Sequence, residues 1–343
     1  MVLAVAVAVA GVTSAVAGHF AARVGARRLL WTALFVWAAL LVVLSVTPQR
    51  SSFMVVLVAV EIAGGSIDTA MNAEASHRLL GRPGALVRFH ALFNSGALVG
   101  AAAAGIIVRV GISWRWVWPG VALLAVAVGL WAWRSNEGAP APAADAPRGA
   151  HPFTHIRLDG LMVLLAIFAL AEVTEGGVDT WGVLYLRTHL ATGVLLGAGA
   201  YVVGQSVAAT TRGAGGGLLG RLSARRALIV GGCVASGGIL LESLSPLSVT
   251  AALGLALGAG GASLFWPLVM STVTRISSQA LSAVGTFTAA GYIGWVAGAP
   301  LIGWISQTWG PSHGLQVMAV AALGVALLSA LRPERSPAPR RAG

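Results

Sequence analysis

The stretch LLWTALFVWAALLVVLSVT, residues 29–47, contains no charged side chain and directly follows the basic segment GHFAARVGARR, residues 18–28. A helix needs about 20 mostly apolar residues to cross the hydrocarbon core of a bilayer. Residues 29–47 therefore predict a membrane-spanning helix. The arginines of residues 18–28 should hold one end of this helix at the membrane surface.

Apolar stretches of this kind recur along the whole chain. The chain has 343 residues, of which 57% are hydrophobic and 10% are charged, whereas a soluble domain carries roughly 25% charged residues. We therefore predict an all-α polytopic membrane protein. Its eleven expected spans are 1–18, 29–47, 52–77, 85–108, 114–133, 158–186, 192–216, 228–245, 248–274, 280–308 and 311–331.

The composition excludes several classes of enzyme and cofactor site. All 22 basic residues are arginine, and a nucleotide-binding P-loop or a Schiff base requires a lysine. One cysteine, Cys233, permits neither an internal disulfide nor a thiolate metal cluster. His151 and His155 have metal-like spacing, but no further ligands accompany them. We therefore expect no metal, no cofactor and no enzymatic activity.

The arginines alternate from loop to loop, which predicts the orientation of the chain. Cytoplasmic loops of membrane proteins are enriched in arginine, so the richer side, the linker and the C-terminus should lie in the cytoplasm. The net charge of +11 then needs no nucleic-acid partner. The richer side holds Arg23, Arg27, Arg28, Arg78, Arg82, Arg88, Arg134, Arg148, Arg157, Arg221, Arg225, Arg226, Arg275, Arg332, Arg335, Arg340 and Arg341; the other holds Arg50, Arg109, Arg115 and Arg187, with Arg212 left near a helix end.

One long connection, from Arg134 to Arg157, contains the Pro/Ala/Gly-rich sequence GAPAPAADAPRGA and is predicted to be a flexible linker. The predicted organisation is an N-terminal half (1–133), the linker (134–157), a C-terminal half (158–331) and a tail (332–343). A second basic loop, GLLGRLSARR at residues 217–226, matches the first at 18–28. Two spans precede it in its half, but only one precedes residues 18–28. If the halves are repeats, the first helix is missing, and we expect a misplaced or truncated start.

The loop at 18–28 has the pattern Gly-x-x-x-Asp-Arg-x-Gly-x-Arg-Arg, with Ala22 in the acidic position. The chain resembles the major facilitator superfamily, whose loop between helices 2 and 3 carries this pattern, and within it the fucose–proton symporter branch. The resemblance implies a monomeric transporter in which residue 1 begins helix 2. We expect the loop arginines to latch the cytoplasmic gate through contacts with neighbouring helix ends. The segments that carry the branch resemblance are DTAMN (68–72), LGRP (80–83), FHALFNSG (89–96), Glu175-Gly176, Trp181, Tyr185-Leu186, FWP (265–267) and GYIG (291–294); the gating residues are Gly18, Arg23, Gly25, Arg27, Arg28, Arg221, Arg225 and Arg226.

Acidic residues gather in two of the predicted spans. A charge in the bilayer core is costly, so such residues normally face a partner or a cavity and are functional by default. Residues seven apart share a helix face, which aligns Glu61 with Asp68 and Glu172 with Asp179. The resemblance makes these spans helices 4 and 7, which line the central cavity. The acids concerned are Glu61, Asp68 and Glu74 in one span and Glu172, Glu175 and Asp179 in the other.

Asp68 is the first candidate for a proton-carrying carboxylate. A desolvated carboxyl group accepts a proton more readily, and the resemblance places Asp68 at the helix 4 acid of the fucose symporter. The alternative is that Asp68 simply bonds Asn72 or an arginine. Glu175 matches a family acid and could serve the solute or the proton. Glu61, Glu172 and Asp179 complete the proton-coupling candidates, whereas Glu74, beside His77 and Arg78, is expected to form a gate or a surface ion pair.

The candidate solute-binding residues each have a structural alternative. Asn94 matches a family asparagine that contacts substrate, but it could equally join helices by hydrogen bonds. His90 could relay protons or merely pack. Trp181 and Trp266, with Tyr185 and Phe265, could stack on a sugar-like ring, although tryptophans at span ends usually belong to the interfacial belt. Asn72 completes the set.

Together these features predict a proton-coupled secondary transporter of a small polar, sugar-like solute in the bacterial cytoplasmic membrane. The predicted partners are the solute, protons and the lipid bilayer. An exporter of drugs or metabolites from the same superfamily is the first alternative. The second is a truncated, non-transporting remnant that has lost one cavity wall with helix 1.

Overall fold

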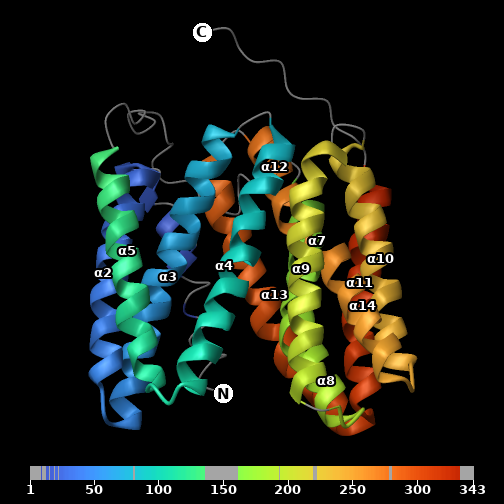
Figure 1. Ribbon diagram of the computed structural model, residues 1–343. Helices are drawn as coiled ribbons and strands as arrows, with labels where there is room; N and C mark the ends of the chain where they lie inside the picture. Colours follow the sequence, from blue (N-terminus) through green and yellow to red (C-terminus); the bar gives the residue numbers. More distant parts are fainter. Residues whose placement is uncertain are drawn as a thin grey trace, which may run out of the picture. The chain divides into compact units, whose positions relative to one another are not determined.

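The computed structural model describes residues 9, 13, 14, 16–18, 20, 21, 23–79, 82–135, 161–192, 194–218, 222–277 and 280–332. Throughout this part of the chain the regular elements are helices (Figure 1). Most of the predicted span 1–18, most of the linker and the tail beyond residue 332 lie outside the described residues. So do Ala22 and Arg221.

The all-α membrane fold predicted from the apolar stretches is confirmed. Each predicted span from residue 29 onward coincides with one helix or with consecutive helical segments. Seven helical segments among the described residues are long and apolar enough to cross a membrane. The elements are α2 (Ala26–Val46), α3 (Arg50–Arg78), α4 (Pro83–Arg109), η1 (Trp114–Trp116), α5 (Val117–Arg134), α7 (Met162–Gly177), η2 (Val178–Gly182), α8 (Val183–Thr188), α9 (Val194–Leu218), α10 (Ala224–Leu244), α11 (Ser248–Ala262), α12 (Phe265–Ile276), α13 (Ala280–Trp309) and α14 (Pro311–Leu331).

The chain forms two compact units, and α4 and α13 each contribute to both of them. The predicted halves at 1–133 and 158–331 do not map directly onto these units, and that division stays a prediction. Unit 1 contains Met1–Arg78, Val99–Asp159 and Ser277–Tyr292; unit 2 contains Leu79–Leu98, Gly160–Ile276 and Ile293–Gly343.

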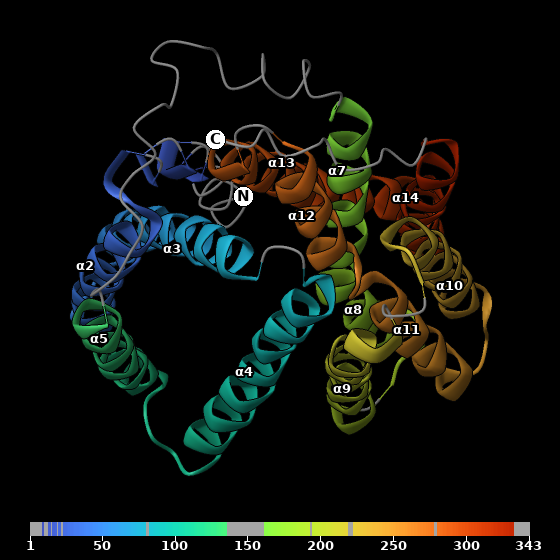
Figure 2. The same cartoon turned by 90° about the horizontal axis from the view of Figure 1, so that it is seen from above.

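In unit 1, α2 packs against α3 and α5, and the three helices lie side by side in both views (Figures 1 and 2). One face of α2 is buried and the opposite face is exposed. The buried face carries apolar residues at helical spacing, which pack on α3 and α5, while valines such as Val36 and Val43 are exposed. This pattern suits a helix with one face toward protein and the other toward lipid. The core residues are Leu34, Ala38, Leu41, Leu44, Val60, Ala122 and Ala125.

In unit 2, α10 packs closely against α11 and α14, and small residues make this possible. A Cβ at Gly238 would lie 2.7 Å from the carbonyl oxygen of Gly254, and a Cβ at Gly231 would lie 2.8 Å from that of Gly261. These separations are shorter than a van der Waals contact. The α10–α11 seam therefore requires glycine because the two backbones touch.

Two loop arginines reach the ends of neighbouring helices, as the sequence predicts. Arg27, at the start of α2, donates from Nε to the carbonyl oxygen of Ala132 in α5 at 3.2 Å. Arg225, at the start of α10, donates from Nε to the carbonyl oxygen of Ser329 in α14 at 2.9 Å and from Nη2 to that of Ala330. The last carbonyls of a helix lack intrahelical partners and favour positive charge. Each arginine therefore caps a helix within its own unit.

The other residues of the two loops have different roles. Gly25 precedes α2 with φ +93°, a conformation that favours glycine over other residues. Gly18 lies against α13, because a Cβ at Gly285 would be 2.7 Å from the Cα of Gly18. Arg23, Arg28 and Arg226 are exposed. The gating role of the loops stays a prediction.

Candidate functional site

The acid-bearing helix of unit 2 changes its geometry at Asp179. α7 ends at Gly177 and continues without a break into η2, a π-helical turn that contains Asp179, and then into α8. Single π-turns within α-helices occur frequently at functional sites. Glu172 and Glu175 lie in the preceding turns of α7, and Glu172 is buried. The acids of this helix therefore lie in and just before the turn where the α-helix becomes a π-helix.

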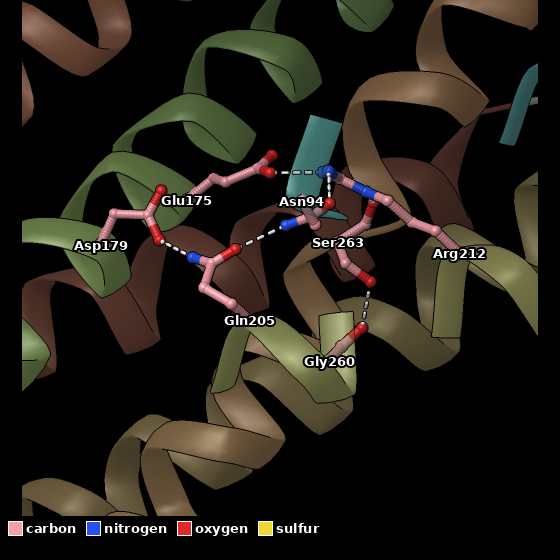
Figure 3. A network of polar contacts seen from close by, with 7 residues as sticks. All are labelled: Asn94, Glu175, Asp179, Gln205, Arg212, Gly260 and Ser263. Carbon is pink, nitrogen blue, oxygen red and sulfur yellow. Dashed lines mark hydrogen bonds and ion pairs between the residues drawn. The ribbon is translucent and has the colours of Figure 1, made fainter. Parts of the chain in front are cut away.

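Arg212 of α9 is the centre of a buried polar network (Figure 3). Its side chain is 3% exposed. Nη2 forms an ion pair with Oε1 of Glu175 at 2.5 Å, and Nη1 donates to Oδ1 of Asn94 in α4. The guanidinium group thus joins side chains of three helices within unit 2.

The third contact of Arg212 depends on a break in a neighbouring helix. α11 ends at Ala262 and α12 begins at Phe265. In a continuous helix the carbonyl oxygen of Ser263 would accept from residue 267, which is proline and has no N–H group. Nε of Arg212 donates to this carbonyl oxygen at 2.5 Å instead. Ser263 turns its own hydroxyl back to the carbonyl oxygen of Gly260 at 2.7 Å.

Gln205, also on α9, connects the asparagine to the second acid (Figure 3). Nδ2 of Asn94 donates to Oε1 of Gln205 at 2.6 Å, and Nε2 of Gln205 donates to Oδ1 of Asp179 at 2.7 Å. Asn94 and Gln205 are both buried. Glu175 and Asp179 therefore belong to one hydrogen-bonded group that also contains one guanidinium. We call Asn94, Glu175, Asp179, Gln205 and Arg212 the Arg212 network.

In unit 1, Asp68 of α3 has neutral partners. Nδ2 of Asn72 donates to Oδ1 of Asp68 at 2.8 Å and to its carbonyl oxygen at 3.0 Å. The side chain of Tyr292, in the part of α13 that belongs to unit 1, also hydrogen-bonds Asp68. The bond between Asp68 and Asn72 is the structural alternative weighed from sequence. Proton transfer at Asp68 stays a prediction.

The remaining acids of α3 lie in different surroundings. Glu61 is partly buried, two turns before Asp68. Glu74 forms an ion pair with Nε of Arg78 at 2.6 Å, one turn further along α3. The Arg78 side chain is 53% exposed, so this pair lies at the surface, which is one of the two positions expected for Glu74.

The aromatic candidates divide into two places within unit 2. Trp266 lies near His90, with ring centroids 6.4 Å apart, and near Phe168, at 4.8 Å. His90 lies one helical turn before Asn94 on α4. In sequence, this ring cluster is therefore next to a residue of the Arg212 network. Trp181 packs instead against Gly303 of α13, where a Cβ would lie 3.0 Å from its ring.

Tyr185 has a structural partner in unit 2. Its hydroxyl donates to the carbonyl oxygen of Ser243 at 3.1 Å and lies 3.1 Å from Oγ of Ser312. Phe265 is fully buried. Both residues therefore hold helices together in this structure.

Sequence reasoning missed Arg212, Gln205, Ser263 and Tyr292. Arg212 was a visible signal, because it is an arginine within an apolar stretch, and such residues are functional candidates by default. Gln205 lies seven residues earlier and so shares its helix face. Ser263 could have been found from Pro267, which frees its carbonyl group. Tyr292 belongs to the GYIG segment (291–294) that carries the branch resemblance, but nothing in that segment points to a bond with Asp68.

Comparison with known proteins identifies the family. The profile described as Major Facilitator Superfamily matches residues 1–280. The chain belongs to this superfamily of transporters. Among curated proteins, the membrane protein MosC of Rhizobium meliloti is 25% identical over 314 residues, which cover 90% of this chain and 74% of MosC.

Solved structures of this superfamily share the fold. The fucose:proton symporter FucP of E. coli superposes with a TM-score of 0.78 at 16% identity, covering 97% of this chain and 90% of FucP. The human organic anion transporter MFSD10 gives a TM-score of 0.78 at 17% identity, over 96% of this chain and 82% of MFSD10. The proton:xylose symporter XylE gives 0.73 at 13% identity, over 95% and 84%. At these identities the likeness shows the fold alone.

Proposed function

We propose that the chain is a secondary active transporter that moves a small polar, sugar-like solute together with protons by alternating access. The Arg212 network is the observation that carries this proposal. It joins two partly buried carboxylates to two buried amides and one buried guanidinium in a protein of a transporter superfamily. So many polar groups are expensive within a membrane, and they are retained mainly where they serve transport.

The network has the chemistry to bind a polyhydroxylated solute. A hydroxyl group both donates and accepts hydrogen bonds, and the amides of Asn94 and Gln205 offer both functions within one group. Solute hydroxyls can replace the Asn94–Gln205 and Gln205–Asp179 bonds one for one. The Trp266 and His90 rings supply an apolar face near Asn94. This assignment favours Asn94, His90 and Trp266 over Trp181 as solute contacts.

Asp68 is the proposed carrier of the coupled proton. Its hydrogen-bond partners, Asn72 and Tyr292, are neutral, so a proton can bind or leave without breaking an ion pair. Glu175, by contrast, is paired with Arg212. Protonation of Glu175 would leave a buried guanidinium uncompensated, which is costly. Glu61, Glu172 and Asp179 are the further candidates.

The arginine distribution supports the proposed orientation, with the linker and C-terminus in the cytoplasm of a bacterium. The proposed working form is a monomer in the cytoplasmic membrane, and lipid would cover apolar faces such as that of Val36 and Val43 on α2. The proposed function involves the solute, protons and lipid, and no nucleic acid.

Uptake of a panel of labelled sugars into proteoliposomes with an inward proton gradient tests this proposal. We expect uptake of one or more sugars that collapses when the gradient is dissipated. Asn94→Ala should lower uptake roughly 10- to 100-fold, because it removes hydrogen bonds to charged or solute groups. Ser95→Ala is the matched control, since Ser95 is exposed on α4 and its hydroxyl only bonds the carbonyl oxygen of Ala91.

Three results would overturn the proposal. If the rate of uptake does not depend on the proton gradient, transport is not coupled to protons. If Asn94→Ala takes up sugar at the wild-type rate, the solute does not bind at the Arg212 network. Transport only in the opposite direction, detected by efflux from loaded vesicles, would show an exporter instead.

A further inference from the structure

Glu242 is an acidic residue near the end of α10, away from the contacts of the Arg212 network. It has no exposed surface. Among the described residues, neither of its carboxyl oxygens has a hydrogen-bond partner. Glu175 and Glu74 differ from it, because each is paired with an arginine. Glu242 is therefore a buried acid that the proposed transport mechanism leaves unused.

The carboxyl group of Glu242 lies against the π-turn η2. A Cβ built on Gly182, the last residue of η2, would lie 3.3 Å from Oε1 of Glu242 and would clash with Leu255 of α11. On the other side, a Cβ on Gly254 of α11 would lie 2.5 Å from the backbone nitrogen of Glu242. Gly182 therefore lies beside the carboxyl group, Gly254 lies against the backbone of Glu242, and the residue has no exposed surface.

No cationic partner reaches this carboxyl group from the described elements that pack on α10. α11 carries no titratable side chain. η2 and α8 carry Asp179, Tyr185 and Arg187; α14 carries His313 and α12 carries Arg275. Asp179 accepts from Gln205, and Tyr185 donates to Ser243. None of these groups forms a hydrogen bond or ion pair with Glu242 in this part of the chain.

The surroundings of Glu242 indicate which ligand its carboxyl group can bind. A metal cation such as Ca²⁺ takes six or more oxygen ligands, and this buried position offers one carboxyl group. Burying an unpaired carboxylate costs several kcal/mol, and a bound proton removes that charge without needing further space. The fitting ligand is a proton.

We propose that Glu242 is a second proton-binding site, separate from the Arg212 network, and that its side chain lies against Gly182 of η2 only while this proton is bound. Release of the proton leaves a charge that must reach water, so the contact between Glu242 and Gly182 opens. Asp179 lies in the same π-turn as Gly182. The site therefore links proton release at the end of α10 to the turn that positions an acid of the Arg212 network.

Hydrogen exchange of residues 178–188 at different pH values tests this inference in the purified, membrane-reconstituted protein. If opening releases one proton, amide protection in wild type falls by up to about tenfold per pH unit above the pKa of a water-exposed glutamate, about 4.3, after correction for the intrinsic exchange rate. In Glu242→Gln, which is neutral at every pH, protection should not depend on pH. Glu74→Gln is the matched control and should behave as wild type, because Glu74 lies in a surface ion pair.

Equal pH dependence in wild type and Glu242→Gln would overturn the inference, as would a flat profile in wild type. Glu242→Leu provides a second neutral side chain of similar size and should also fold. If neither variant folds, the site requires the carboxyl group itself and the proposal is wrong. The measurement needs no transported solute, so its failure is distinct from a failure of the proposed function.

Discussion

The two units use the same device to hold their helices together but surround their acids very differently. Arg27 caps α5 in unit 1, and Arg225 caps α14 in unit 2, each from the start of a helix that follows a basic loop. Asp68 of unit 1 is bonded by Asn72 and Tyr292, whereas Glu175 of unit 2 is paired with Arg212.

This difference suggests a division of labour between the units. An acid with neutral partners can exchange a proton at little cost to its surroundings. An acid fixed by a guanidinium and linked to amides instead provides a fixed set of donors and acceptors. We therefore expect proton exchange at Asp68 and solute recognition at the Arg212 network.

Removing the charge of Arg212 should be the most damaging change. Arg212→Gln leaves the partly buried Glu175 and Asp179 without their cation, and breaking a buried pair costs up to about 3–5 kcal/mol. We expect a large loss of thermal stability, measured by the melting temperature in detergent. Arg212→Lys should lose less because it retains the charge.

The double variant Arg212→Gln/Glu175→Gln is the sharper form of this experiment. It removes both members of the ion pair, so it should recover a substantial part of the lost stability. If the double variant is as unstable as the sum of its single variants, the ion pair does not explain the loss.

Two glycine substitutions test the difference in helix packing between the units. Gly238→Ala in α10 would place its Cβ 2.7 Å from the carbonyl oxygen of Gly254, and overpacking of this kind costs about 1–3 kcal/mol. Gly64→Ala in α3 of unit 1 would meet Nε1 of Trp37 at 3.8 Å, an ordinary contact. It should be neutral or slightly stabilising, because alanine favours helix by up to about 1 kcal/mol.

Gly237→Ala is the control within α10, since a Cβ there meets no atom within 4 Å. Chemical denaturation of the three variants gives the comparison. A destabilised Gly237→Ala variant would show that α10 tolerates no substitution at all, and a stable Gly238→Ala variant would show that the α10–α11 seam is looser than described.

The arginine caps should give the smallest effects, somewhat larger for Arg225, which donates two hydrogen bonds, than for Arg27, which donates one. Arg27→Ala and Arg225→Ala each remove contacts with the carbonyl groups at a helix end, at a cost of about 1 kcal/mol. The exposed neighbours Arg28 and Arg226 provide matched alanine controls, for which we expect little change. A larger loss for Arg27→Ala than for Arg225→Ala would contradict the described contacts of the two loops.

The fold followed from sequence because apolar stretches such as residues 29–47 allow a single burial pattern, a helix across the bilayer. The acids of the candidate site were also visible as charges within those stretches. The arginine pattern alone does not distinguish Arg212, because most arginines of a membrane protein lie at the membrane surface. Gln205 is uncharged and leaves no such mark.

Other features depend on long-range packing that a sequence pattern does not encode. The π-turn at Val178–Gly182 and the packing of Glu242 against Gly182 both arise where η2 meets α10 and α11. The contact between Asp68 and Tyr292 joins residues of α3 and α13, far apart in the chain. Pro267 was the one local signal for the break between α11 and α12.

The division of labour between the units is tested most directly by measuring proton uptake on addition of a transported sugar to proteoliposomes, comparing Asp68→Asn with Glu74→Gln. Both variants neutralise an acid of α3, but Glu74 lies in a surface ion pair. We predict that Asp68→Asn abolishes sugar-driven proton uptake while still exchanging sugar across the membrane, and that Glu74→Gln retains both. Sugar-driven proton uptake that persists at wild-type level in Asp68→Asn would contradict the account and move proton exchange to the acids of unit 2.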